Sequence, residues 1–137
     1  MRVVLDTNVW LSGLMLPDSI PGQVVRAVIG NQIGAVLSEP LLDALTRALT
    51  YPKVRDRIRL ADDALQRVTA ELRYVTEWVS ITAVKVRVPR DRQDDIVLAT
   101  FVTSRADALV SGDADLLDLA PRYAVLTPRA FFDQHLR

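Results

Sequence analysis

The chain has 137 residues, no cysteine and a single histidine, and its 17 basic side chains balance 17 acidic ones, so the formal net charge is zero. Half of the residues are hydrophobic, which predicts one folded domain over residues 1–137 and argues against disorder. The lack of cysteine excludes disulfides, thiolate nucleophiles and cysteine-based zinc sites. One histidine, His135, gives little material for a Ser-His-Asp triad.

The sequence also bears on compartment and on chemistry. No apolar run approaches the roughly 18 residues of a membrane span, and the start lacks a secretory leader. We therefore expect a cytoplasmic protein without membrane contact. The acids are 14 Asp and only 3 Glu, so any catalysis must run on carboxylates, hydroxyls and arginines.

Short apolar runs alternate with helical patterns along the chain. In chain order we expect a strand at 1–5, a helix through 10–14, a helix at 22–29, a strand at 33–37, helices at 38–49, 53–58 and 61–77, a β-rich segment at 79–88, a helix at 93–104, a strand at 108–110, a short helix after 113, a strand at 123–126 and a helix from 128. This alternation predicts an α/β fold with a parallel sheet covered on both faces.

Aspartates stand where two of the expected strands end. Asp6 directly follows the first strand, and Asp113 follows the strand at 108–110. Asp94 and Asp95 begin a helix, and Asp115 comes two residues after Asp113. In open parallel sheets, sites form at the carboxyl ends of the strands. Carboxylates gathered there repel and raise one another's pKa unless a cation offsets their charge.

A carboxylate cluster without His or Cys is an all-oxygen site that suits Mg²⁺ or Mn²⁺. A metal there acidifies a bound water and stabilises charge on a phosphodiester, so the pattern favours metal-assisted phosphodiester hydrolysis. Each acid also has a simpler interpretation. Asp6 and Asp113 are ordinary helix caps, and the pair Asp94-Asp95 suits the first turn of a helix.

Other phosphate chemistries lack their residues. Phosphoryl transfer through an aspartyl phosphate, as in haloacid-dehalogenase-like phosphatases, needs Asp-x-Asp after the first strand, and Asp6-Thr7-Asn8 lacks the second acid. That chemistry and receiver domains also need a lysine at the site, and the chain has only Lys53 and Lys85. Neither the P-loop nor the Gly-x-Gly-x-x-Gly motif is present.

Four segments resemble the acidic blocks of PIN domains. They are Val4-Leu-Asp6-Thr-Asn8-Val, Leu37-Ser-Glu-Pro-Leu-Leu-Asp43 with Tyr51-Pro-Lys53, Asp91-Arg-Gln-Asp94-Asp95-Ile-Val-Leu-Ala99, and Ala106-Asp-Ala-Leu-Val-Ser-Gly-Asp113-Ala-Asp115-Leu-Leu. The resemblance runs in order from residue 1 to about 119 and is greatest to stand-alone PIN proteins of the VapC-like type. It implies a three-layer α/β/α sandwich with a central parallel sheet, Mg²⁺ or Mn²⁺, endoribonuclease activity on RNA, a homodimer, and an antitoxin partner.

One position departs from the family pattern. Where these proteins usually carry a glutamate before the leucine that matches Leu45, this chain has Ala44. The resemblance therefore makes Asp6, Asp94 and Asp113 the metal ligands, with Asp115 as a catalytic support and Asp43 as the candidate fourth ligand. Helical geometry turns Asp43 away from the apolar stripe and toward solvent. An alternative function is a catalytically degenerate PIN domain that binds RNA or a protein.

Several other residues are weaker candidates. Glu39 is another substitute for the missing glutamate, and Thr7, Asn8 and Ser111 are candidate supports for the acids. The apolar stretch from Trp10 to Leu16 favours core packing, or alternatively a groove for an antitoxin peptide. Arginines that either meet phosphate or form a solvated face are Arg55, Arg57, Arg59, Arg87, Arg90 and Arg92.

Overall fold

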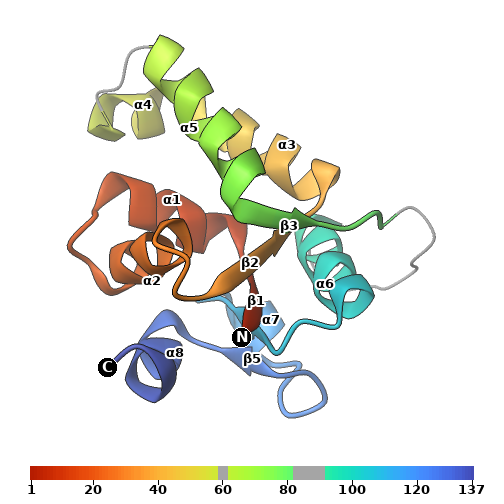
Figure 1. Ribbon diagram of the computed structural model, residues 1–137. Coiled ribbons are helices and arrows are strands. Elements are labelled where there is room, and N and C mark those ends of the chain that lie inside the picture. Colours follow the sequence, from red (N-terminus) through yellow and green to blue (C-terminus); the bar gives the residue numbers. More distant parts are fainter. Residues whose placement is uncertain (59–61, 82–91) are drawn as a thin grey trace.

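The computed structural model describes residues 1–58, 62–81 and 92–137. Its centre is a sheet of five parallel strands in the order β3-β2-β1-β4-β5 (Figure 1). The strands are β1 (Arg2–Leu5), β2 (Gly34–Leu37), β3 (Thr76–Trp78), β4 (Ala108–Val110) and β5 (Val125–Leu126). β1 lies in the middle because the chain first adds strands on one side of it and later on the other.

Helices cover both faces of this sheet. They are α1 (Thr7–Met15), α2 (Ile20–Ile29), α3 (Glu39–Leu49), α4 (Pro52–Ile58), α5 (Asp62–Val75), α6 (Arg92–Ser104), α7 (Ala114–Leu117) and α8 (Pro128–His135). In Figure 1, α1, α2 and α8 lie on one side of the strands and α6 on the other. Helix α3 contacts both α1 and α6. The predicted three-layer α/β/α sandwich is confirmed.

The strands form where short apolar runs are buried from both faces. Val3, Val4 and Leu5 of β1 have no exposed surface, and all of β4 is buried. Parallel strands between two helical layers need such continuous apolar runs rather than alternation. The core continues through Trp10 on α1 and Phe131 on α8, which are both completely buried.

Hydroxyl side chains fix where three of the helices begin. Ser19, Ser38 and Thr127 each accept a hydrogen bond from the backbone N–H three residues later, at the starts of α2, α3 and α8. Proline stands in the first turn of all three helices, where its missing N–H costs nothing. Ser38 Oγ also lies 2.8 Å from Thr100 Oγ1, a buried contact that joins α3 to α6.

The third strand is the element that the sequence places least well. The helix predicted over 61–77 ends at Val75, and Thr76–Trp78 form β3. These residues pair with β2, so pairing across the sheet overrides the helical pattern. The β-rich segment expected at 79–88 thus starts after the observed strand, and its residues 82–88 lie outside the described residues.

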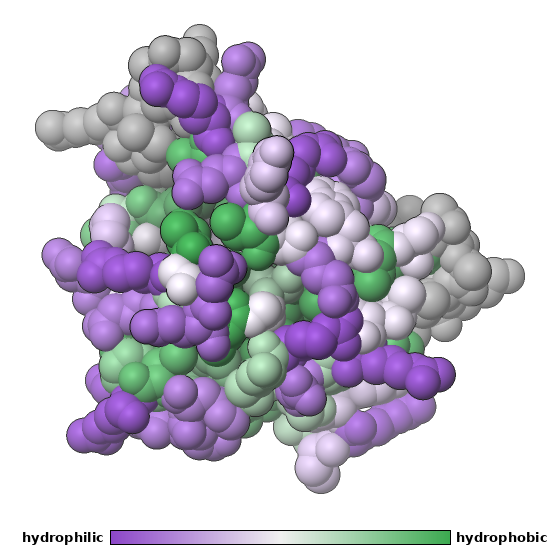
Figure 2. All heavy atoms as spheres, in the orientation of Figure 1, coloured by the Kyte–Doolittle hydropathy of each residue, from purple (hydrophilic) through white to green (hydrophobic). Residues whose placement is uncertain are grey.

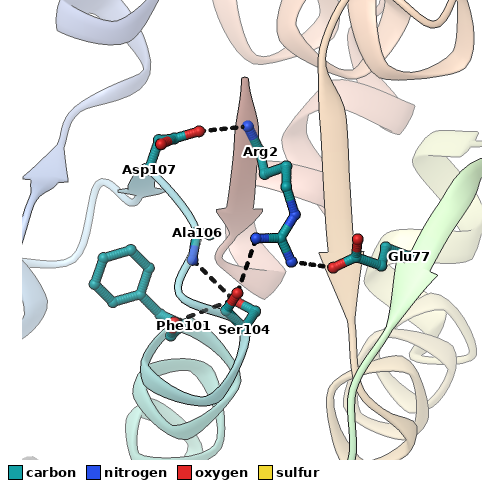
Figure 3. A network of polar contacts seen from close by, with 6 residues as sticks. All are labelled: Arg2, Glu77, Phe101, Ser104, Ala106 and Asp107. Carbon is teal, nitrogen blue, oxygen red and sulfur yellow. Dashed lines mark hydrogen bonds and ion pairs between the residues drawn. The ribbon is translucent and has the colours of Figure 1, made fainter.

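Arg2, the first residue of β1, joins several chain segments through polar contacts (Figure 3). Its backbone N–H donates to Asp107 Oδ2 at 2.8 Å, and its guanidinium donates to the backbone oxygen of Ser104 at 2.9 Å. The guanidinium also pairs with Glu77 on β3. This network links β1, β3 and the end of α6, and we assign it a structural role.

The surface is mostly hydrophilic on the face shown in Figure 2, with smaller hydrophobic patches over α1 and α2. Leu16, just after α1, is 62% exposed, whereas Trp10 in the same stretch is fully buried. The core-packing interpretation thus holds for Trp10 but not for Leu16. Across the described ranges, no helix combines the length and the apolar character that crossing a membrane requires.

Candidate active site

The strand order places the acids at one point of the sheet. The chain builds β2 and β3 on one side of β1 and then crosses to β4, so the order reverses between β1 and β4. Ligand sites of open parallel sheets form outside the strand carboxyl ends at such a switch point. Asp6 follows β1 and Ser111 follows β4. The backbone N–H of Asp6 donates to Val110 O at 3.0 Å, which ties the two strand ends together.

Asp6 is a buried carboxylate, only 4% exposed. It occupies the N-cap position of α1, yet its side chain makes no capping hydrogen bond. Instead, Ser111 Oγ donates to Asp6 Oδ2 at 2.8 Å. Burial raises the pKa of Asp6 and the negative charge of Asp113 adds to that rise, while Ser111 and the nearby backbone N–H groups of Thr7 and Asn8 oppose it. The hydrogen bond from Ser111 ties this carboxylate to the end of β4, which a helix cap alone would not do.

Ser111 connects Asp6 to the second acidic segment. Its Oγ accepts a hydrogen bond from the backbone N–H of Asp113 at 2.9 Å, and its side chain is completely buried. Asp113 in turn caps α7, because its Oδ1 accepts from the N–H of Asp115 at 2.8 Å. The capping interpretation thus describes Asp113 correctly but accounts for only one of its oxygens. One buried hydroxyl fixes the positions of two acids.

Three carboxylates converge at this point. Asp94, Asp113 and Asp115 each offer an oxygen, and these oxygens lie within 4.8 Å of one another. Asp94 comes from the first turn of α6 and is 4% exposed, while the other two are partly exposed. Like charges at such distances raise the free energy of the protein unless a cation or a proton neutralises them. Acids from α6 and from the segment after β4 thus meet near the end of β1, although these segments are far from β1 in the sequence.

A cavity of about 250 Å³ opens beside these acids. Its lining combines acidic, polar, apolar and aromatic side chains: Asp6, Thr7, Asn8, Leu11, Ala44, Ala48, Tyr51, Asp94 and Asp113. The structure thus places the candidate supports Thr7 and Asn8 at the site. Ala48 and Tyr51 were not among the candidates from sequence, and they reach the cavity from the end of α3.

The structure does not bring the substitute acids to this cavity. Ala44 lines it, whereas the neighbouring Asp43 is exposed and lies outside it. Helical geometry predicted this orientation of Asp43. Glu39 pairs with Arg73, whose guanidinium nitrogens donate to its carboxylate at 2.9 and 3.2 Å. This hydrogen-bonded pair lowers the pKa of Glu39. Neither of the two acids of α3 therefore lines the acidic cavity.

Among the candidate arginines, the structure describes the side chains of Arg55 and Arg57. Arg55 lines a separate groove between α3, α4 and α5 rather than the acidic cavity. Arg57 is exposed on α4, which fits a solvated face. The acid Asp91, the arginines Arg59, Arg87 and Arg90, and the side chain of Arg92 lie outside the described residues.

The raised pKa of Asp6 has a consequence for stability. A carboxyl group whose pKa is raised by folding adds stability that is fully present below its unfolded pKa and is lost as pH rises through its folded pKa. At pH 7 the ionised, buried Asp6 thus opposes folding of the metal-free protein. We expect Asp6→Asn, which cannot ionise, to unfold at a higher temperature than the parent in EDTA at pH 7.

Thermal unfolding at several pH values between about 4 and 7 checks this expectation. The difference between the unfolding midpoints of Asp6→Asn and the parent should shrink as the pH falls toward about 4, the pKa of an aspartate in the unfolded chain. Asp18→Asn is the matched control, since the Asp18 side chain is fully exposed and its replacement should leave the midpoint nearly unchanged. A lower midpoint for Asp6→Asn at pH 7 would show that its contacts outweigh the cost of burying the charge.

Comparison with known proteins identifies the family. The chain belongs to the PIN domain family, whose model matches residues 2–115. An uncharacterized protein of Methanocaldococcus jannaschii is 28% identical over 120 residues, which are 87% of this chain and 75% of that protein.

A solved structure shares the fold. It is the crystal structure of VapBC2 from Rickettsia felis bound to a DNA fragment from their promoter. The similarity covers 93% of this chain and 98% of the matched chain, with a TM-score of 0.60 and 10% sequence identity. At that identity, the likeness supports the fold and carries no residue roles.

Proposed function

We propose that this chain is a divalent-metal-dependent endoribonuclease. The observation that carries the proposal is the convergence of Asp94, Asp113 and Asp115 within 4.8 Å, beside the buried Asp6 at the switch point of a PIN-domain sheet. The family membership supports a nuclease, and the carboxylate cluster supplies oxygens that can bind a divalent cation. Asp6, Asp94 and Asp113 are the proposed metal ligands, and Asp115 is a proposed fourth acid of the same centre.

The residues present fit a hard divalent cation. All donors at the cavity are oxygens, and at least two of the acids are buried. Mg²⁺ and Mn²⁺ prefer carboxylate oxygens and need few protein ligands, since they keep waters or substrate oxygens. A bound cation would remove the like-charge repulsion within the cluster. The missing acid at position 44 leaves this donor set smaller but chemically consistent.

The protein's own residues prepare the site for phosphodiester hydrolysis. When bound, a divalent cation supplies an acidified water and neutralises charge that develops on the phosphate. Ser111 holds Asp6 and Asp113 in fixed orientations through its two hydrogen bonds. Asp115 belongs to the same carboxylate cluster and is partly exposed, so we assign it the role of accepting a proton from the attacking water. Leu11, Ala44 and Ala48 make part of the cavity lining apolar.

An antitoxin is the proposed protein partner. The likeness to a chain of the VapBC2 complex supports a toxin of a toxin–antitoxin pair, and the exposed apolar Leu16 at the end of α1 offers a contact for such a partner. A homodimer and a cytoplasmic location belong to the same proposal. Co-expression with the product of a small neighbouring reading frame, followed by co-purification, tests the partnership.

A catalytically degenerate PIN domain is the second candidate function. The specific observation in its favour is Ala44, which lines the acidic cavity where the family usually supplies a glutamate. Such a protein would bind RNA or a partner without cutting. Metal binding alone would not separate the two functions, so the deciding readout is cleavage.

Cleavage of labelled single-stranded and structured RNA by the purified protein tests the proposal. We expect cleavage with Mg²⁺ or Mn²⁺ and none in EDTA, and we expect it to return when metal is added in excess of the chelator. Cleavage that persists in EDTA would contradict the metal-dependent mechanism. Absence of cleavage with both metals, although metal binds, would favour the degenerate module.

A further inference from the structure

The lining of the acidic cavity combines two chemistries. The acids Asp6, Asp94 and Asp113 line it together with three uncharged side chains from α3 and the residues just after it, which are Ala44, Ala48 and Tyr51. Among the described residues that line the cavity, only the three acids are charged. A cavity of about 250 Å³ lies just below the roughly 300 to 1,000 Å³ of pockets for whole small molecules. It suits one flat group of a longer substrate.

The uncharged part of the lining comes from α3 and the residue that follows its cap. Ala44 and Ala48 stand at positions i and i+4, on one face of α3, and Tyr51 comes directly after the C-cap residue Thr50. Leu41, Leu45 and Leu49 form the adjoining buried stripe. Because both alanines are short, the surface between the acids and Tyr51 is hollow and apolar. A larger side chain at position 44 or 48 would fill it.

Tyr51 presents an aromatic ring from a fixed backbone. Its N–H donates to Ala48 O at 3.3 Å, and its carbonyl accepts from the N–H groups of Val54 and Arg55 at 3.0 and 2.9 Å. These bonds hold it between the end of α3 and the start of α4. The residue is nevertheless 56% exposed, so its ring is open to solvent at the rim of the cavity.

We infer that Tyr51 and the alanine floor form a subsite in which a base of the RNA substrate stacks, next to the phosphodiester held at the acids. This inference rests on the proposed function and names the substrate class, which is RNA with unpaired bases. An aromatic side chain beside a phosphodiester site stacks unpaired bases. The two alanines present an apolar surface to a base face, and no basic side chain among the described residues lines the cavity, so we assign a base rather than a phosphate to the part of the lining that Tyr51 forms.

Steady-state cleavage of a single-stranded RNA oligonucleotide with Mn²⁺ tests the subsite. Losing one stacking contact costs about 1 to 3 kcal/mol, so we expect Tyr51→Ala to raise KM about tenfold with kcat within about twofold. Tyr51→Phe keeps the ring and should match the parent. Tyr74→Ala is the matched control, because Tyr74 is 93% exposed on α5 and does not line the cavity.

Oligonucleotides that lack one base distinguish base stacking on Tyr51 from a purely structural role of this residue. In oligonucleotides with one abasic ribose at successive positions, the parent should show a KM rise at one position near the cleaved bond. Tyr51→Ala should not respond at that position, as expected when the same contact has already been removed. Ala48→Leu, which fills the floor but retains the ring, should also raise KM.

The outcomes separate the two proposals. If the parent cleaves RNA but Tyr51→Ala has an unchanged KM, or Tyr51→Phe is impaired as strongly as Tyr51→Ala, the stacking subsite is wrong and the ribonuclease stands. If the parent neither binds nor cleaves RNA, both proposals are wrong. Equal unfolding midpoints for Tyr51→Ala and Tyr74→Ala would show that a KM difference does not come from misfolding.

Discussion

Replacing Asp94 by Asn is expected to lower the rate of metal-dependent RNA cleavage by about 1,000-fold or more. Asp94 is 4% exposed and belongs to the cluster of three carboxylates. A metal ion contributes several kcal/mol to the stabilisation of a transition state, and each 1.4 kcal/mol is a factor of ten in rate. Asparagine keeps the size of the side chain but removes its charge. A lower cleavage rate would therefore reflect weaker metal binding rather than altered packing.

Single-turnover cleavage with saturating Mn²⁺ measures this effect, and calorimetric titration with Mn²⁺ measures the accompanying loss of affinity. Asp18→Asn is the control for the substitution itself, because the Asp18 side chain is fully exposed and its Oδ1 lies as far as 3.6 Å from Arg26 Nη2. Parent-like cleavage by Asp94→Asn would remove this residue from the proposed metal centre and would point to a contaminating nuclease.

The acids were predictable because their positions depend on simple rules. A short apolar run that ends in Asp6 is a strand followed by a polar residue, and parallel strands place such residues at one edge of the sheet. Asp113 after β4 follows the same rule. The helical start that contains Asp94 approaches the same edge because α6 leads directly into β4. These arguments need only strand ends and chain direction.

Other features of the site depend on tertiary packing and could not be deduced in the same way. Ser111 bridges two acids, but its sequence context is that of an ordinary turn. Tyr51 follows α3, which contacts both α1 and α6, so its position at the cavity depends on how the helices pack. The pairing of β3 with β2 cuts short a helical pattern that otherwise continues. In each case a contact between distant segments decides the outcome.

Asp43 and Ala44 are neighbours on α3, yet their side chains face different surroundings. Adjacent positions are rotated by about 100°, so the acid at 43 faces solvent while the methyl group at 44 faces the cavity. A carboxylate one position along the chain therefore cannot replace the family's glutamate without unwinding α3. This geometry makes position 44 the place to restore the missing charge.

We expect Ala44→Glu to bind Mn²⁺ about tenfold to a hundredfold more tightly than the parent. The new carboxylate would enter the cavity that Asp6, Asp94 and Asp113 line. Opposite charges about 4 Å apart attract by about 4 kcal/mol at an effective dielectric constant of 20, and desolvation of the added carboxylate offsets part of this gain. Without metal the same charge should destabilise the fold through repulsion.

Calorimetric titration with Mn²⁺ and thermal unfolding in EDTA measure the two effects of Ala44→Glu. Ala44→Gln is the matched control, because it adds the same bulk without charge and should not tighten metal binding. Equal affinities of the Glu and Gln variants would mean that position 44 does not face the bound metal. If Ala44→Glu also cleaves RNA faster, the alanine limits activity through metal occupancy. If affinity rises and the rate at saturating metal does not, the acids already present suffice for the chemistry.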